Sequence, residues 1–151
     1  GPFEIIKADC LHAQVLAEMH GESFDEGWSA SSFATTLGTP GSYGYIAVRS
    51  RDAEPLGFGL FRAGGGESEV LSIATRSHAR GAGVAKALMQ AALAEACRVG
   101  VQTFYLEVAV DNAAAIRLYD GLGFVETGRR PGYYARAHGL RVDALIMALD
   151  L

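Results

Sequence analysis

The most constraining feature of the sequence is a change of hydrophobic period at Thr75. The segment before it, Glu69–Thr75, is typical of a strand, and Gly83–Val99 then runs without proline or internal glycine to a terminating Gly100. Its apolar residues recur at helical spacing: Val84, Leu88, Ala91, Ala92 and Ala96. The next segment, Val101–Val108, again alternates like a strand. This strand–helix–strand unit predicts a right-handed parallel crossover and therefore an α/β domain.

The rest of the chain supplies further elements of both kinds. Strands are expected at Phe3–Lys7, Tyr43–Arg49, Leu56–Arg62, Phe124–Arg129 and Asp143–Leu149. Helices are expected at Cys10–Glu22, with Leu11, Val15 and Met19 on one face, at Ser29–Leu37, and from Asp111 or Asn112 to Leu122. We expect one domain over residues 3–151, with a mixed sheet of about seven strands and four helices.

Composition narrows the class of protein. Half of the 151 residues are apolar and 20% are charged, which excludes low-hydrophobicity disorder. A net charge of −4 argues against nucleic-acid binding. The longest aliphatic run, Ala144–Leu149, is far shorter than the roughly 20 residues of a membrane span. We interpret Gly1-Pro2 as a tag remnant, see no leader segment, and expect a cytoplasmic protein.

Metal and disulfide chemistry have no support in the residue spacing. Cys10 and Cys97 lie far apart and form no CxxC motif. The four histidines, including His138 in a polar segment, lack the spacing of metal ligands. We expect no bound metal and no disulfide framework.

A glycine loop opens the crossover helix: Arg80-Gly81-Ala82-Gly83-Val84-Ala85-Lys86. Small residues at a helix start present successive N–H groups, which together with the helix dipole suit a phosphate or pyrophosphate. The loop does not match a dinucleotide fingerprint, which needs glycine where Lys86 stands, nor a Walker loop. From the residues alone, a tight turn without a ligand is an equal alternative.

The loop and its neighbours resemble a known family. Arg80-x-x-Gly83-x-Ala85 after the strand Val70–Thr75 is similar to the acetyl-CoA signature of the GNAT N-acetyltransferases. The likeness continues downstream through Leu106-Glu107-Val108, Asn112–Ile116, Leu118-Tyr119 and Leu122-Gly123-Phe124. With Gly27-Trp28-Ser29, Tyr133-Tyr134 and Asp143–Leu149, it is closest to the RimI-type branch, which acetylates a ribosomal-protein N-terminus. The resemblance implies a GNAT fold with a mixed, mostly antiparallel sheet.

The resemblance also implies where acetyl-CoA binds as co-substrate. Its pyrophosphate is expected on Arg80 and on the N–H groups of Gly81, Ala82, Gly83, Val84, Ala85 and Lys86. The pantetheine arm is expected along the strand edge of Ile73, Ala74 and Thr75, with Asn112 on its other side. Thr75 and Ala85 depart from the residues usual in RimI-type enzymes, but both side chains are small.

Two catalytic residues follow from the same resemblance. Glu107 is the expected base, acting through water, and Tyr119 the expected acid toward the departing thiolate. Glu107 lies in an otherwise apolar strand, and partial burial of a carboxylate generally favours its use as a base. The alternatives are a solvent-facing strand glutamate and an ordinary tyrosine of an amphipathic helix.

The substrate side is less well defined. Trp28, Tyr133 and Tyr134 are expected to line a slot for a peptide end, or else to pack as ordinary aromatic residues. An acidic set could attract an amine, but a solvated acidic face is the preferred interpretation: Glu22, Asp25, Glu26 and Asp143. The loop Ala135–Leu140 departs most from the family pattern. His138 is expected to have no catalytic role.

Three functions remain after these arguments. The first is acetylation of a protein N-terminal α-amine, whose pKa of about 8 makes it easier to neutralise than a lysine at about 10.4. The second keeps the co-substrate but acetylates a small amine or a lysine side chain. The third is a CoA-binding module without activity. We expect a monomer that binds neither nucleic acid nor membrane.

Overall fold

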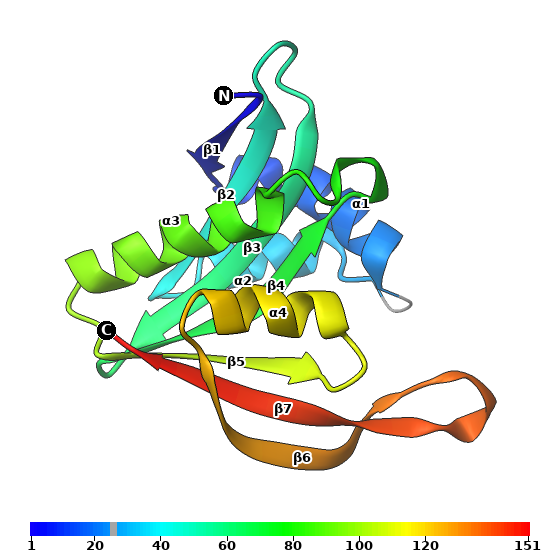
Figure 1. The fold of residues 1–151 in the computed structure, drawn as a ribbon. Coiled ribbons are helices and arrows are strands. Elements are labelled where there is room, and N and C mark those ends of the chain that lie inside the picture. The colour runs from blue at the N-terminus through cyan, green and yellow to red at the C-terminus, as the bar shows by residue number, and fades with distance from the viewer. Residues whose placement is uncertain (25–26) are drawn as a thin grey trace.

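The computed structural model, which describes residues 1–24 and 27–151, builds one sheet with the strand order β1-β2-β3-β4-β5-β7-β6 (Figure 1). The strands are β1 Phe3–Lys7, β2 Ser42–Arg49, β3 Pro55–Gly64, β4 Glu67–Thr75, β5 Thr103–Ala109, β6 Val125–Ala135 and β7 Arg141–Asp150. Only β4 and β5 pair in parallel among these strands. The predicted mixed, mostly antiparallel sheet is confirmed.

The four α-helices of the described residues form a layer on each face of the sheet. They are α1 Ala13–Ser23, α2 Ala30–Leu37, α3 Val84–Arg98 and α4 Ala113–Gly121. α3 and α4 cover one face and α1 and α2 the other (Figure 1). Ser29 and Asn112 cap α2 and α4 by accepting hydrogen bonds from backbone N–H groups of their first turns. No helix in this part of the chain is long and apolar enough to cross a membrane.

The core explains why β3 is buried without alternation. Helices lie on both sides of it, so every residue from Leu56 to Phe61 is buried. Phe58 packs toward α1 and α2, whereas Phe61 and Phe104 pack with α3 and α4. Each fully buried phenylalanine contributes about 1.5–3 kcal/mol of transfer free energy. This two-sided core fixes the position of β4 beside β3.

The sheet opens at its centre. β4 and β5 pair only where Glu67–Glu69 meets Thr103–Tyr105, although both strands continue beyond this point. From Val70 onward, β4 pairs with β3 on one edge and with no strand of the described residues on the other. The two strands therefore diverge, and one edge of β4 is open toward the end that leads into the glycine loop.

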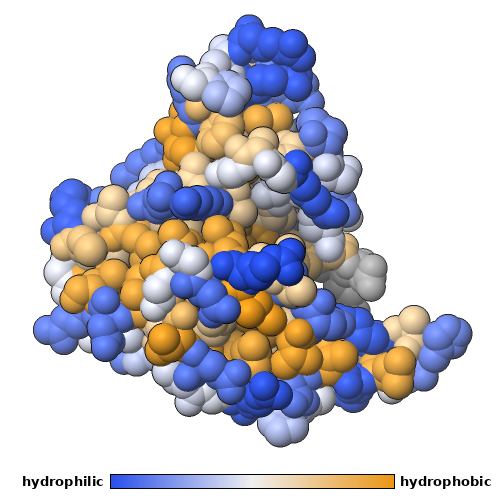
Figure 2. All heavy atoms as spheres, viewed as in Figure 1, coloured by the Kyte–Doolittle hydropathy of each residue, from blue (hydrophilic) through white to orange (hydrophobic). Residues whose placement is uncertain are grey.

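A long arm of β6 and β7 extends from the other half of the sheet. The predicted strand Phe124–Arg129 is too short, because β6 continues to Ala135 after a register shift between Arg130 and Tyr134. Pro131 has no N–H to donate to a ladder, and Gly132 has a positive φ of 57°. The arm tip projects from the body of the molecule and carries both polar and apolar residues (Figures 1 and 2).

The first helix also differs from expectation. Leu11 is 88% exposed instead of facing the core with Met19. Residues Cys10–His12 form a separate 3-10 turn capped by Asp9, so the helical phase starts only at Ala13. The face that α1 buries consequently includes Leu16 and Met19. Periodicity extrapolated through a turn of different pitch gave the wrong face.

Candidate active site

The open edge of β4 presents two of the three expected strand residues. The N–H of Arg76 donates to the carbonyl of Leu56 on β3 at 2.8 Å. Since backbone groups along a strand point to alternate edges, Ala74 also faces β3, whereas Ile73 and Thr75 direct their N–H and C=O groups to the open edge. This edge can pair with an extended, amide-bearing ligand as a further strand would.

The glycine loop forms a row of backbone donors beside that edge. Gly81 and Gly83 have φ values of 81° and 84°, a left-handed conformation that L side chains rarely adopt. Within the described residues, no acceptor meets the N–H groups of Gly81, Ala82 and Gly83. The first turn of α3, from Val84 to Lys86, adds N–H groups that have no partner within the helix.

This geometry fits an anion of the pyrophosphate type. The donors are consecutive, the dipole of the 15-residue α3 adds positive potential, and no Cβ fills the space at Gly81 or Gly83. Arg80 and Lys86 flank the row, and neither forms an ion pair with a described residue. The loop geometry is therefore compatible with the expected co-substrate.

Glu107 points away from the helix-covered face of β5. Its neighbours Leu106 and Val108 are buried in the core, so alternation turns the carboxylate to the opposite face. There, Oε1 accepts a hydrogen bond from Nε of Arg130 at 2.7 Å, and 30% of the Glu107 side chain is exposed. The Glu107 side chain is thus partly covered and ion-paired, and the ion pair is a contact that the sequence-based alternatives do not include.

Tyr119 lies on the core side of α4. It is 5% exposed and meets the ring of Phe124 edge-on, with the centroids 5.9 Å apart. Burial raises its pKa to about 12, and the phenol of Tyr134 adds to this rise. The hydroxyl has no hydrogen-bond partner in residues 1–24 and 27–151. It is therefore protonated at neutral pH and available to donate.

Tyr134 connects the two expected catalytic residues electrostatically. Burial raises the pKa of Tyr134, with a further contribution from Glu107. Tyr134 in turn raises the pKa of Tyr119, so its phenol is within electrostatic range of both groups. Tyr133 meets it edge-on at 5.1 Å, and the guanidinium of Arg136 lies 5.6 Å from the Tyr134 ring. The arm thereby contributes its aromatic pair to the neighbourhood of Glu107.

Asn112 serves the site first as a helix cap. Its Oδ1 accepts the N–H of Ala115 at 3.2 Å and so fixes the start of α4. Its amide NH₂ donates to no described residue. The same side chain therefore fixes the start of the helix that carries Tyr119 and keeps an amide donor that no other described residue uses.

Trp28 belongs to a different aromatic cluster. It stacks on His20 at 5.0 Å and contacts Phe33 at 5.2 Å, while its backbone N–H donates to His20 Nδ1 at 3.1 Å. Burial lowers the pKa of His20. The structure does not bring Trp28 together with Tyr133 and Tyr134 by ring contact.

The expected acidic set does not form one group. Glu22 pairs with Arg76 at 3.2 Å, and Asp143 accepts the N–H of Gly132 at 2.9 Å. Asp25 and Glu26 lie outside the described residues. His138 adopts a positive φ of 61° in an exposed turn, and no interaction within the described residues connects it to the site.

Sequence reasoning did not single out His20 or Arg130. A buried histidine among aromatic residues leaves no distinctive local pattern. Arg130 is separated from Glu107 by 23 positions, and only the sheet order brings them together. No sequence signal identifies that pair.

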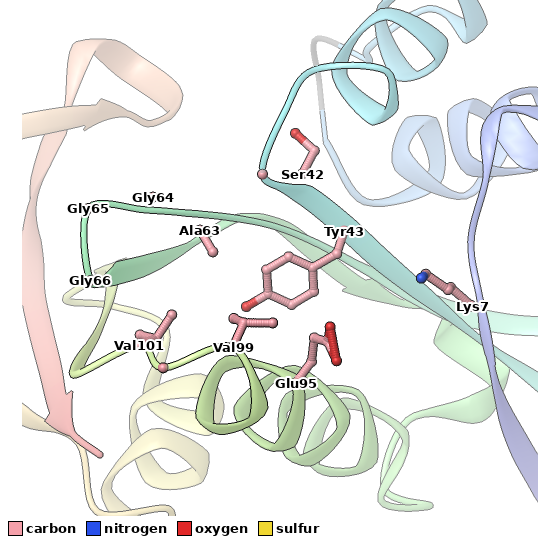
Figure 3. Close-up of a pocket in the computed structure, with 12 residues that line it drawn as sticks. Lys7, Ser42, Tyr43, Ala63, Gly64, Gly65, Gly66, Glu95, Val99 and Val101 are labelled. Carbon is pink, nitrogen blue, oxygen red and sulfur yellow. The ribbon is translucent and has the colours of Figure 1, made fainter.

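A cavity of about 440 Å³ lies away from this site. It is located between the β3–β4 turn at Gly64–Gly66 and the end of α3, with Tyr43, Glu95 and Val99 around it (Figure 3). The Tyr43 hydroxyl forms a hydrogen bond with Ser68 Oγ at 2.6 Å. Burial raises the pKa of Tyr43 to about 12. Because the glycine loop follows the other end of β4, this cavity does not belong to the candidate active site.

Comparison with known proteins agrees with the site and the fold. Residues 13–124 match the Acetyltransferase (GNAT) family. This is more than half of the chain, which therefore belongs to that family of acetyltransferases and is an acyltransferase. The family predicted from the glycine loop and its downstream motifs is confirmed.

Relatives place the chain near the RimI-type branch. It is 34% identical to the [ribosomal protein bS18]-alanine N-acetyltransferase of Escherichia coli K12 over 125 residues, 82% of this chain and 81% of the relative. It is also 34% identical over 143 residues to the N-alpha-acetyltransferase RimI of Mycobacterium tuberculosis, covering 91% and 86% of the two chains. The crystal structure of the Escherichia coli S18-alanine enzyme superposes with a TM-score of 0.89 at 28% identity, covering 98% and 93%.

Proposed function

We propose that this protein transfers an acetyl group from acetyl-CoA to the N-terminal α-amine of a protein, with a ribosomal protein that begins with alanine as the leading candidate. The observation that carries the proposal is the divergence of β4 and β5, which opens a strand edge beside a row of unpaired N–H groups. The substrate class rests on the similarity to the bS18-alanine enzymes.

The backbone holds and polarises the co-substrate in this proposal. N–H groups from Gly81 to Lys86 bind the pyrophosphate, and the edge of Ile73 and Thr75 pairs with the pantetheine amides. Acetyl-CoA supplies the activated acetyl group as a thioester. A backbone N–H directed at the thioester oxygen stabilises the charge that develops there, and one such donor is worth about 3–4 kcal/mol.

The side chains move protons. Glu107 accepts a proton from the acceptor amine through a water molecule, which leaves the nitrogen lone pair free to attack. Tyr119 donates its phenolic proton to the departing sulfur, a role that suits a hydroxyl whose pKa of about 12 keeps it protonated at neutral pH. Asn112 caps the start of α4 and so fixes the helix that carries Tyr119.

An α-amine is the acceptor that this machinery serves best. Its pKa of about 8 leaves a tenth or so neutral at pH 7, whereas a lysine at about 10.4 is almost fully charged. One glutamate that accepts the proton through water is a sufficient base for the α-amine and a weak one for the lysine side chain. Tyr133 and Tyr134 on the arm are the proposed wall for the peptide end.

A peptide library tests the proposal directly. The protein is incubated with acetyl-CoA and short peptides that begin with Ala, Ser or Gly, and thiol release and added acetyl mass are measured. A matched set with blocked N-termini and one internal lysine is the control. We expect acetylation of free Ala-starting peptides only. Activity on lysines or small amines alone, or acetyl-CoA binding without turnover on any amine, would overturn the proposal.

A further inference from the structure

The pair of Arg130 and Glu107 spans three strands. Glu107 on β5 faces Ile146 on β7, which faces Gly128 on β6. Arg130 lies two residues further along β6, opposite Ala144. Residues in register and residues two apart share a face of the sheet, so the Arg130 side chain crosses β7 over the small Ala144 to reach Glu107.

Small side chains keep this path open. Ala144 ends at Cβ, and Gly128 adds no side chain beside the guanidinium. The far end of Arg130 has a second anchor, because its guanidinium carbon lies 5.8 Å from the centre of the Tyr133 ring. The hydrogen bond from Nε to Oε1 and the ring contact together hold the cation beside the carboxylate.

Of the other arginines of the arm, Arg141 donates to the backbone carbonyls of Gly132 and Tyr133, and the remaining two have carboxylate partners away from the proposed base. Arg129 pairs with Glu126 at 3.3 Å and with Asp143 at 3.8 Å, and Arg136 pairs with Asp111 at 2.8 Å. Arg130 differs from both because its partner is Glu107 itself. Of the described ion pairs, this one places a permanent positive charge where the proposed reaction removes a proton.

The charges around the acceptor nitrogen determine how readily the acceptor amine loses its proton. The titratable and charged groups of the described residues around this place are Glu107 on β5, Tyr119 on α4, Glu126, Arg129, Arg130, Tyr133, Tyr134 and Arg136 on and after β6, Arg141 and Asp143 on β7, and Asp111 after β5. Arg129 pairs with Glu126 and Asp143, Arg136 pairs with Asp111, and Arg141 donates to the backbone carbonyls of Gly132 and Tyr133. Of these cations, Arg130 is the one with a described ion pair to Glu107.

We propose that Arg130 is a positioning residue for the acetyl transfer: it holds the Glu107 carboxylate in place and keeps a cation beside the acceptor amine, which favours the neutral, nucleophilic amine over the ammonium. The inference rests on the proposed function. A like charge within about 4–6 Å disfavours a second positive charge and shifts the pKa of the affected group by roughly 1–3 units. An α-amine with a pKa of about 8 is then substantially neutral at pH 7.

Loss of the Arg130 charge is expected to shift the pH dependence of the reaction in one direction. Removal of the cation leaves the bound amine beside Glu107 alone, so the amine retains its proton to higher pH. In Arg130→Gln, we expect the acid limb of kcat/KM for an Ala-starting peptide to move up by about one pH unit. This is roughly a tenfold loss at pH 7 that disappears near pH 9. KM at pH 7 rises less than kcat falls.

Matched variants separate charge from packing. Arg129→Gln is the control, because Arg129 lies next in sequence, is similarly exposed at 53% against 54%, and pairs elsewhere. Its acid limb is expected to coincide with that of the parent protein. Arg130→Lys retains the positive charge, and its acid limb of kcat/KM is expected to lie close to that of the parent protein. Thermal melts and acetyl-CoA affinity are measured for all three variants to confirm folding.

The outcomes distinguish the two proposals. An equal loss of activity at every pH in Arg130→Gln, or a shift of the limb in Arg129→Gln as well, would overturn the role of Arg130 and leave the proposed function intact. If the parent protein acetylates another amine instead of peptide N-termini, the proposed function fails and the same pH comparison is made with that amine. Acetylation of no amine would overturn both.

Discussion

The two sides of the candidate site use different parts of the polypeptide. The co-substrate side consists of backbone groups: the open edge of β4 and the donor row from Gly81 to the first turn of α3. The acceptor side consists of side chains on strands that are distant in sequence, such as Glu107 and Arg130. A backbone site depends on local conformation, whereas a side-chain site depends on strand order and register. The comparison explains why the loop on the first side is recognisable as one contiguous motif, whereas no sequence signal identifies the contact between Arg130 and Glu107 on the second side.

The largest effect on activity is expected when the proton-transferring groups on the acceptor side are removed. Glu107→Gln and Tyr119→Phe are each expected to lower kcat by roughly 10²–10⁴, because proton transfer in the transition state is lost. Acetyl-CoA affinity, measured by calorimetry, is expected to remain near that of the parent protein, since the backbone site is untouched. Near-normal turnover in both variants would reject these roles, and a parallel loss of affinity would show that the two sides are not separable.

The alkaline stability of the protein tests the burial of Tyr119. Its folded pKa of about 12 exceeds the ordinary value of 10.0, so the corresponding stability is complete below pH 10 and is lost as the pH rises through about 12. Two pKa units correspond to roughly 3 kcal/mol at most. Urea unfolding at pH 8 to 11.5 is expected to show a shallower alkaline decline in Tyr119→Phe. Tyr43→Phe, which removes another buried phenol with a pKa of about 12, is the matched control for a residue outside the site.

A substitution in the glycine loop tests the backbone side by itself. Gly83→Ala meets no atom within 4 Å, but its φ of 84° strains any L residue by about 1–2 kcal/mol. We expect a roughly tenfold weaker acetyl-CoA affinity as the loop relaxes. Gly121→Ala is the control, because that position is equally open and does not have a positive φ. An unchanged affinity in Gly83→Ala would mean that the loop conformation does not define the anion site.

The smallest expected effect concerns His20, which accepts the backbone N–H of Trp28. Burial lowers the folded pKa of His20 below 6.5, so the unfolded chain binds the proton more readily and stability falls as the pH drops below about 6.5. His20→Gln, which keeps an acceptor but does not titrate, is expected to flatten this acid decline in thermal melts at pH 5 to 8. A decline that persists unchanged in the variant would assign it to other groups.

The errors made from the sequence have physical causes of the same kind. Apolar spacing predicts Leu11 on the buried face because it does not distinguish a 3-10 turn from the helix that follows. The sequence pattern predicts too early an end for β6 because Pro131 and Gly132 interrupt it, although pairing with β7 resumes at Tyr134. Both errors arise where neighbouring elements override a local signal.

The sequence by itself determined the order of strands and helices, the parallel crossover and the glycine loop, because hydrophobic period and the conformational freedom of glycine act over a few adjacent residues. Tertiary structure alone decided that β4 and β5 separate after Glu69 and Tyr105, that Tyr134 lies within range of both Glu107 and Tyr119, and that Arg130 reaches Glu107. These relations depend on which strands are neighbours and in what register. Long-range packing of the whole chain sets both, and no local pattern encodes them.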